Sequence, residues 1–196
     1  MFPTVDSAVL TVLSFSVKPR TGREVARMAE RSQDATQRVL DRLVGHGIVL
    51  SKEAGRARVY ELNREHLAAE SISDLAHLRL ALFSRLEYFL DIWQVRPLHA
   101  SVFGSAARGD GGVDSDIDIF LVRPSAVDED DEDWRRQLDV LAKVVFEWTG
   151  NHAGIAEVAE EDLERLRFEQ PSIVESLRSD AVDIVGVPSR SLLRDA

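Results

Sequence analysis

The chain has 196 residues and a net charge of −10; 44% of the residues are apolar and 30% are charged, enough for a core under a polar surface. It contains no cysteine, which excludes disulfides and thiolate metal sites and favours a cytoplasmic protein. No apolar run approaches the roughly 20 residues that a membrane helix needs, and the first residues lack the features of a signal peptide, so no membrane partner is expected.

Charge is unevenly distributed along the chain. Residues 1–66 hold 11 Lys and Arg against 8 Asp and Glu, a balance of +3, whereas residues 67–196 hold 13 against 26, a balance of −13. The first segment suits an approach to nucleic acid and the second would be repelled by it. The asymmetry predicts two units with different partners, although ordinary variation between surfaces would also produce it.

Three short helices are predicted in the first third. Apolar residues recur at helical spacing over residues 5–15. Thr21 and Glu24 form a capping box that predicts the start of a second helix. Ser32 is the expected cap of a third helix, which should end before Gly47.

A β-hairpin is predicted next, in "IVLSKEAGRARVYEL". Alternating apolar residues flank the turn signal Ala54-Gly55-Arg56, which gives the hairpin a basic tip. Three short helices followed by a basic hairpin are typical of a winged helix-turn-helix domain. Nearly all of residues 5–66 resembles the MarR- and ArsR-like bacterial regulators, through "TGREVAR", "TQRVLDRLVGHGIV" and "GRARVYEL".

This resemblance implies binding to double-stranded DNA, with the third helix in the major groove and the hairpin on phosphate or the minor groove. The residues implied in DNA contact are Gln33, Thr36, Gln37 and Arg38 on the helix, and Lys52, Arg56 and Arg58 on the hairpin. A module for protein interaction or dimerisation is the alternative, because a fold alone does not fix function.

The segment from His66 to Val95 predicts one long amphipathic connecting helix, which Pro97 prevents from continuing. Its apolar residues occupy more than one face, which suits packing on both units or a dimer seam. His66, His77 and His99 show no metal-ligand spacing and are interpreted as structural.

The second unit alternates strands and helices. Strands are predicted at "HASVF", "IDIFLV", "GIAEVA" and "AVDIVGV", with a helix in "EDWRRQLDVLAKVVFEWTG" and shorter helices at about residues 161–168 and 173–178. An acidic run, "VDEDDEDW", is explained by a solvated loop that leads into a helix N-terminus.

Two carboxylates in the apolar strand "IDIFLV" and its approach require an explanation, because a buried carboxylate is costly unless it is paired or binds metal. Asp116 and Asp118 are two residues apart and should project from one face of the strand. Gly104 permits close approach of the backbone to a ligand, and Ser105 offers a hydroxyl at the start of a short helix. Together these residues predict a site for a metal–triphosphate.

The stretch resembles the polymerase β-like nucleotidyltransferase superfamily, and in it the minimal nucleotidyltransferase branch. Gly104-Ser105, ten intervening residues and Asp116-Ile117-Asp118 match that pattern without insertion. The resemblance implies that Asp116 and Asp118 bind Mg²⁺ or Mn²⁺ and that Gly104, Ser105 and Arg108 bind a nucleoside triphosphate. A nucleotidyl group would then pass to an acceptor with release of pyrophosphate.

Members of that superfamily usually carry a third carboxylate on the next strand. Glu157 is the favoured candidate for this catalytic and metal-binding role. A gap-free register would instead put Ala156 at the position, and Asp183 is a less favoured substitute. If Glu157 does not serve, the domain would bind nucleotide and metal without turnover.

The expected fold class is α+β: a winged helix-turn-helix (residues 1–66), a connecting helix (67–96) and a small mixed-sheet nucleotidyltransferase fold (97–196). The expected function is a metal-dependent nucleotidyltransferase with a DNA-binding winged helix. The acceptor is open: a protein side chain, by analogy with minimal nucleotidyltransferase antitoxins, a small molecule or RNA. A toxin is a candidate partner. The alternative is a transcription regulator or antitoxin whose inactive transferase domain senses nucleotide or serves as scaffold. The family resemblance implies a homodimer.

Overall fold

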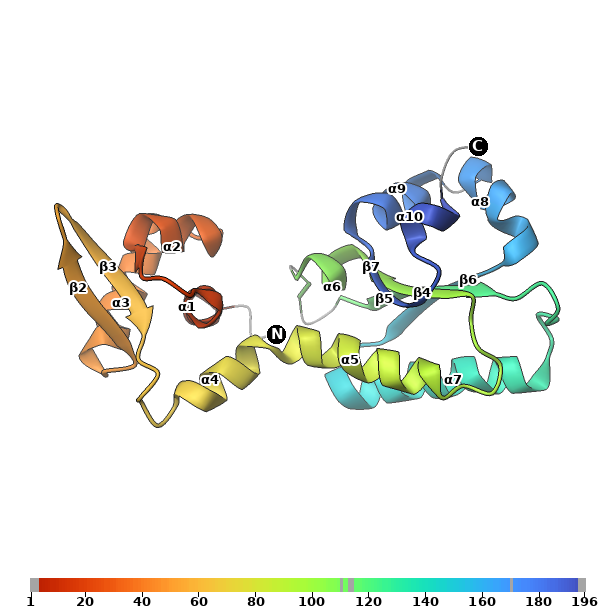
Figure 1. The fold of residues 1–196 in the computed structure, drawn as a ribbon, viewed down its shortest axis with the longest axis horizontal. Helices are drawn as coiled ribbons and strands as arrows, with labels where there is room; N and C mark the ends of the chain where they lie inside the picture. Colours follow the sequence, from red (N-terminus) through yellow and green to blue (C-terminus); the bar gives the residue numbers. More distant parts are fainter. Residues whose placement is uncertain (1–3, 110, 113–114, 170, 194–196) are drawn as a thin grey trace. The chain divides into compact units, whose positions relative to one another are not determined.

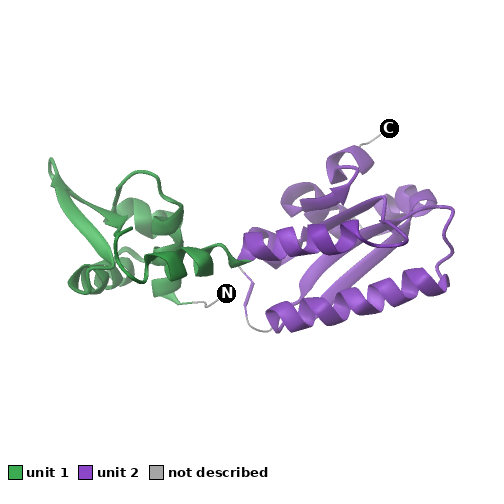
Figure 2. Ribbon diagram, turned by 60° about the horizontal axis from the view of Figure 1, so that its bottom comes forward, with its two compact units in different colours: residues 1–78 green, residues 79–196 purple. Residues whose placement is uncertain are grey.

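The computed structural model describes residues 4–109, 111–112, 115–169 and 171–193. The chain divides into two compact units, residues 1–78 (unit 1) and residues 79–196 (unit 2), shown in Figure 2. This division falls inside the segment predicted as a connector. Within the described residues, no helix is both long and apolar enough to cross a membrane.

Unit 1 is a helical domain with the β2–β3 hairpin at its edge (Figure 1). Its small antiparallel sheet has the strand order β1-β3-β2. Helices α2 and α3, followed by the β2–β3 hairpin, make a winged helix-turn-helix, as the sequence predicted. Its elements are α1 (Val5–Phe15), β1 (Arg20–Thr21), α2 (Gly22–Met28), α3 (Gln33–Gly45), β2 (Val49–Ala54), β3 (Ala57–Leu62) and α4 (Ala69–Ala76).

The starts of α2 and α3 are fixed by the predicted caps. The Thr21 hydroxyl accepts a hydrogen bond from the Glu24 backbone N–H at 3.3 Å, and the Glu24 carboxylate accepts one from the Thr21 N–H at 2.8 Å. Ser32 accepts from the Ala35 N–H at 3.3 Å at the start of α3. These bonds satisfy N–H groups that a helix leaves without partners in its first turn.

The connector predicted as one helix consists of two, α4 and α5 (Leu78–Asp91), which are separated at His77. The His77 N–H bonds back to the carbonyl of Ser73, and its ring packs against Phe15 with centroids 4.4 Å apart. Ile72 packs on the core of unit 1, whereas Leu86 belongs to the core of unit 2. Helix α4 therefore packs on the core of unit 1, and α5 packs in the core of unit 2.

Unit 2 is built on a four-stranded sheet in the order β6-β5-β4-β7. β4 runs antiparallel to β5 and β7, and β6 runs parallel to β5, which confirms the predicted mixed sheet. After α5 its elements are β4 (His99–Phe103), α6 (Gly104–Arg108), β5 (Ile117–Arg123), α7 (Glu132–Thr149), β6 (Ala153–Ala159), a 3₁₀ turn (Glu160–Asp162), α8 (Leu163–Glu169), α9 (Pro171–Asp180), β7 (Val182–Gly186) and α10 (Ser189–Leu192).

Helices cover both faces of this sheet (Figure 1). Ile119 and Leu121 of β5 pack in a core with Trp134 and Leu141 of α7 and with side chains of α5. Phe120 and Val122 point the other way, into a second core with side chains of α8 and α9, which include Leu163 and Leu177. Because strand residues alternate between faces, Asp118 belongs to the face that carries Phe120 and Val122.

His99 is fully buried beneath this second face. Its Nδ1 lies 2.7 Å from the Val187 carbonyl oxygen, and its Nε2 lies 2.9 Å from the Ser101 hydroxyl. A carbonyl only accepts, so Nδ1 donates to Val187 and Nε2 accepts from Ser101. Burial lowers the pKa of His99, partly offset by the Val187 carbonyl and by Asp183, so the ring is held neutral.

Candidate functional site

The turn after β4 brings backbone against a carboxylate. Gly104 has φ +65°, in the left-handed region that favours glycine. A Cβ at this position would lie 2.5 Å from Oδ2 of Asp118. Both the backbone angle and the space therefore require glycine here, and the Asp118 carboxylate lies directly against the turn.

A second glycine approaches the same carboxylate from β6. Gly154 is the register partner of Asp118, and a Cβ on it would lie 2.9 Å from Asp118 Oδ1 and 3.8 Å from Asp116 Cβ. Gly154 was not among the predicted site residues. Its only local signal is a glycine at the start of a strand, which marks close approach of another group.

Electrostatics at Asp118 are unfavourable without a cation. Desolvation raises the pKa of Asp118, and the negative charge of Asp116 raises it further; Arg108 partly offsets both effects. Asp116 is exposed, so the pair is open to solvent on one side. Two close carboxylates with this mutual repulsion fit a divalent cation such as Mg²⁺, which takes its other ligands from phosphate and water.

Ser105 and Arg108 lie on α6, at the same end of the sheet. A Cβ on Gly111 would lie 3.0 Å from Ser105 Oγ, so the glycine-rich return runs close against the hydroxyl. Residues 110, 113 and 114 of the ten-residue spacer lie outside the described residues. The Arg108 guanidinium pairs with Asp180, at the end of α9, at 2.6 Å. Nothing in the local sequence indicated Asp180, which lies 72 residues away.

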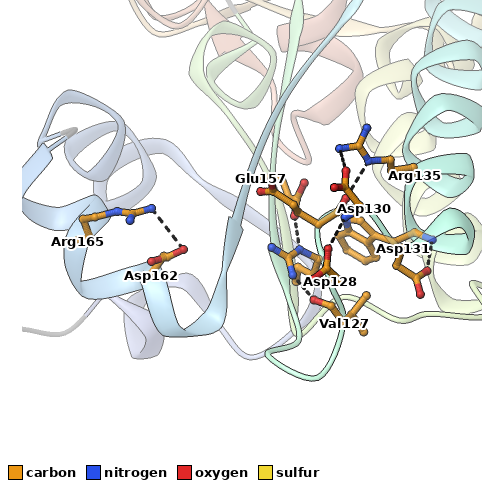
Figure 3. A network of polar contacts seen from close by, with 11 residues as sticks. Val127, Asp128, Asp130, Asp131, Arg135, Glu157, Asp162 and Arg165 are labelled. Carbon is orange, nitrogen blue, oxygen red and sulfur yellow. Dashed lines mark hydrogen bonds and ion pairs between the residues drawn. The ribbon is translucent and has the colours of Figure 1, made fainter.

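Glu157 does not join this group. It is the register partner of Leu121, so it lies on the face opposite to Asp118 and Phe120. Arg123 donates to its carboxylate at 2.6 Å from Nε and contacts the Val127 carbonyl through Nη1 (Figure 3). The Arg123 side chain is only 10% exposed. Glu157 therefore neutralises a buried arginine, on the face of the sheet opposite to that of Asp118.

The residues of β6 that do share the face of Asp118 are Gly154, Ala156 and Val158, the partners of Asp118, Phe120 and Val122. None of these three bears a carboxylate. Asp183 of β7 accepts a hydrogen bond from the Ser189 N–H at 3.1 Å. Across the part of the chain that the structure describes, no group of three or more metal-ligating side chains comes together.

On unit 1, the structure separates the predicted DNA contacts. Thr36 is completely buried, because it precedes the core residues Val39 and Leu40 by three and four positions on α3. Thr36 is thus a core residue and is unavailable to a ligand. Gln37 is half-buried, and its amide donates to Tyr60 and Asp41 at 2.9 Å each.

The other predicted contacts are exposed. Gln33, Arg38 and Arg56 lie on the surface of α3 and at the hairpin tip. Lys52 and Arg58 also face solvent, and each is near a carboxylate: Glu61 at 3.8 Å from Lys52 and Asp41 at 3.9 Å from Arg58. Exposed pairs of this kind contribute little to stability, so Lys52 can readily exchange its partner. Arg58 is also held by two hydrogen bonds to the Ser51 hydroxyl, at 2.7 and 3.1 Å.

The family model described as Nucleotidyltransferase domain matches residues 86–194, more than half of the chain. The chain belongs to this nucleotidyltransferase domain family. The match begins inside α5 and contains the complete sheet of unit 2. The nucleotidyltransferase domain therefore includes the Gly104 turn, both carboxylates Asp116 and Asp118, and Asp180.

Similar solved structures include a MarR family transcriptional regulator from Silicibacter pomeroyi, with 23% identity and TM-score 0.35, covering 43% of this chain and 62% of that one. A mutant of Lactococcus lactis ZitR has 18% identity and TM-score 0.35, with 43% and 59% covered. Wild-type ZitR in complex with DNA has 16% identity and TM-score 0.34, with 43% and 59% covered. The chain thus spans less than two thirds of each structure. No curated protein matches it.

Replacing Glu157 in the nucleotidyltransferase domain should reduce stability and leave the carboxylate site intact. We expect Glu157→Ala to lower the free energy of unfolding by about 2 kcal/mol, because a largely buried guanidinium loses its partner. Glu147→Ala removes an exposed pair with Lys143 at 3.8 Å and should change the free energy of unfolding by less than about 0.5 kcal/mol. Urea unfolding measures both. A Glu157→Ala protein with unchanged stability and lost Mg²⁺ binding would contradict this assignment.

Proposed function

We propose that unit 2 binds a nucleoside triphosphate with Mg²⁺ and transfers its nucleotidyl group to an acceptor. One observation supports this most: the Asp118 carboxylate, repelled by Asp116, lies against the backbone of Gly104 and Gly154. Carboxylates are costly in such surroundings unless a cation neutralises them. Membership of the nucleotidyltransferase domain family gives the reaction class.

Each residue of the site has a distinct task in this proposal. Asp116 and Asp118 would hold Mg²⁺ or Mn²⁺, which when bound neutralises charge on the triphosphate and clamps reacting oxygens. Gly104 leaves the backbone open to phosphate oxygens, and the Ser105 hydroxyl would donate to one of them. Arg108 would orient the triphosphate, since its guanidinium offers several donors beside the carboxylates.

A second candidate function follows from the strand faces. No carboxylate is present at Gly154, Ala156 or Val158, where a group to receive the acceptor's proton would share the face of Asp118. This favours a regulator or antitoxin whose unit 2 binds the metal–nucleotide and does not turn it over. Binding is common to both candidates, and turnover separates them.

The deciding experiment has two parts. Calorimetric titration of each of the four Mg·NTPs into wild type and Asp116→Ala tests the site, and binding that is lost in the variant is expected. Incubation of α-labelled triphosphates with Mg²⁺, protein and cell lysate then tests transfer. A labelled acceptor with released pyrophosphate supports the enzyme. If a triphosphate binds and none of the four gives a labelled product, the regulator is the candidate that remains. If no triphosphate binds, both candidate functions are overturned.

We further propose that unit 1 binds double-stranded DNA as a homodimer, with α3 in the major groove and the hairpin on the backbone. Gln33 and Arg38 are the exposed residues that α3 offers to base edges or phosphates. Arg56 at the hairpin tip, joined by Lys52 and Arg58, suits phosphate. We expect gel filtration or light scattering to give the mass of two chains, as for a homodimer.

The DNA proposal is tested with the duplex upstream of the protein's own gene. Arg38→Ala and Arg56→Ala should each weaken binding and reduce the slope of log K against log salt by about 1, the loss of one phosphate contact. Thr36→Val is the matched control on α3. It removes a buried hydroxyl that has no hydrogen-bond partner among the described residues, so binding should stay unchanged and stability should rise by up to about 1 kcal/mol.

The gel shift is read at several stated salt concentrations. Absence of any shift at low salt would overturn DNA binding. A Thr36→Val protein that loses binding while Arg38→Ala and Arg56→Ala keep it would show that the contacts have been misplaced.

A further inference from the structure

We propose that Arg79 is a positioning residue of the nucleotide site. It would hold α6, the element that carries Ser105 and Arg108, in place without touching the ligand. The inference rests on the proposed function, because it assigns a task in triphosphate binding.

Arg79 contacts the end of α6 opposite to Gly104. Its Nη1 donates to the Ala107 carbonyl at 2.6 Å, and Ala107 is buried. The guanidinium also lies against the backbone of Gly109: a Cβ there would be 3.0 Å from Nη1 and 3.5 Å from Cζ. Gly109 has φ +83° and ends α6, so Arg79 fixes both the last turn of the helix and its termination.

The arginine itself is held by its own helix. Its guanidinium carbon lies 5.9 Å from the centre of the Phe83 ring, one turn further along α5, and Phe83 packs on the core of unit 2. Among the described residues, Arg79 forms no ion pair with a carboxylate. Its charge is therefore directed to a carbonyl at the end of α6, where cations are favoured.

A second contact holds α6 from the other helical layer. Arg108, its last residue, pairs with Asp180 of α9 at 2.6 Å. α5 and α9 cover opposite faces of the sheet, so the five-residue helix is held from both layers. A helix this short has little stability of its own, and its placement depends on these contacts.

The contact at Gly109 also bears on Ser105. Gly111, two residues after Gly109 in the chain, approaches the Ser105 hydroxyl closely. Displacement of Gly109 would therefore shift the surroundings of Ser105.

Asp118, by contrast, is held in β5 by its pairing with Phe103 of β4 and Gly154 of β6. We therefore expect loss of Arg79 to weaken binding of the triphosphate, which Ser105 and Arg108 would contact. Binding of Mg²⁺ by the carboxylates should be unchanged.

This separation gives the test. Two probes are titrated into the full chain by calorimetry: Mg²⁺ alone, and Mg·tripolyphosphate, which has no base. Arg79→Met should weaken Mg·tripolyphosphate binding about tenfold, or about 1.4 kcal/mol, and leave Mg²⁺ binding unchanged. Arg79→Lys keeps a donor that can reach Ala107 and should restore part of the loss. Arg85→Met is the matched control, since Arg85 lies on the same helix over the Trp148 ring at 5.8 Å.

Each outcome decides something. Equal tripolyphosphate affinities for Arg79→Met and Arg85→Met would overturn the inference and leave the proposed function standing. If Arg79→Met binds neither probe, Arg79 has a general structural role, and the inference is also overturned. A wild-type protein that binds neither probe and none of the four Mg·NTPs would overturn the proposed function and this inference with it. If Arg79→Met unfolds, the Arg79→Lys protein carries the comparison.

Discussion

Asp118→Asn is expected to abolish metal–nucleotide binding and at the same time to make the protein more resistant to heat. The amide loses the charge that would hold Mg²⁺, so affinity for Mg·NTP should fall by more than about 100-fold, beyond the loss typical of residues that only support a ligand. In the absence of metal the same change removes a desolvated charge that Asp116 repels. The melting temperature should therefore rise by a few degrees.

The pH dependence of this gain has a definite sign. The pKa of Asp118 is raised in the folded protein above its ordinary value of 3.8, so the folded state binds the proton more tightly than the unfolded state. Stability of the wild type therefore falls as pH rises from about 3.8 through the raised value. The Asn variant lacks this loss, and its advantage should grow over that window and then remain constant towards neutral pH.

Thermal melts of the two proteins at several pH values, with and without Mg²⁺ and nucleotide, measure both effects. Ligand should raise the melting temperature of the wild type and leave that of Asp118→Asn unchanged. Asn is chosen because it keeps the shape of Asp and differs from it by one terminal group, so the comparison reports mainly the charge. An Asp118→Asn protein that melts lower than wild type at neutral pH would contradict the electrostatic account.

Ala156→Asp is expected to increase nucleotidyl transfer. Ala156 is the register partner of Phe120 and shares the face of Asp118, so a carboxylate there would be placed to accept the proton of an attacking hydroxyl. A positioned general base accelerates such reactions by about 100- to 10,000-fold, and the rate of labelled product formation should rise within that range. If wild type shows no measurable turnover, the variant should show some.

Ala156→Asn is the control, because it adds a side chain of the same size without a base. Ala156 is partly buried against the second core, so both variants are expected to lose some stability, which melts will report. The comparison is made between these two folded proteins. If Ala156→Asp binds Mg·NTP and transfers no faster than Ala156→Asn, the missing carboxylate does not limit the reaction.

Local signals in the sequence were sufficient for much of this structure. Capping residues such as Thr21 and Ser32 fixed helix starts in unit 1, because a cap acts within one turn. The Gly104 turn and Asp118 lie close in sequence and meet across adjacent strands, as predicted. Interactions between neighbours in the chain do not depend on how distant segments are arranged.

Predictions that depended on register were less successful. Glu157 and Ala156 are adjacent, and both alternate faces of "AGIAEVA" carry apolar residues, so the sequence cannot tell which face meets Asp118. The pairing of β6 with β5 decides it. Thr36 shows the same difficulty on a helix, where one polar residue at the edge of the apolar stripe is buried against Val39 and Leu40.

The break at His77 had no sequence signal, because neither glycine nor proline lies there. At the break, the His77 ring packs against Phe15, 62 positions earlier in the chain, and its Nδ1 lies close to the Ser73 carbonyl. Asp180 and Gly154 were missed for a similar reason. Each acts on a residue that is distant in sequence, and its own neighbours give no hint of the partner.

The alternation of side chains between the two faces of β5 also disfavours a misfolded sheet. If β5 were to pair one residue out of register, Asp118 would enter the core with Trp134 and Leu141, and Ile119 would lie at the Gly104 turn. Burial of an unpaired carboxylate in that core would be prohibitively unfavourable. Asp118, to which we assign metal binding, therefore also disfavours the slipped sheet, so the same side chain would serve accurate folding and the proposed function.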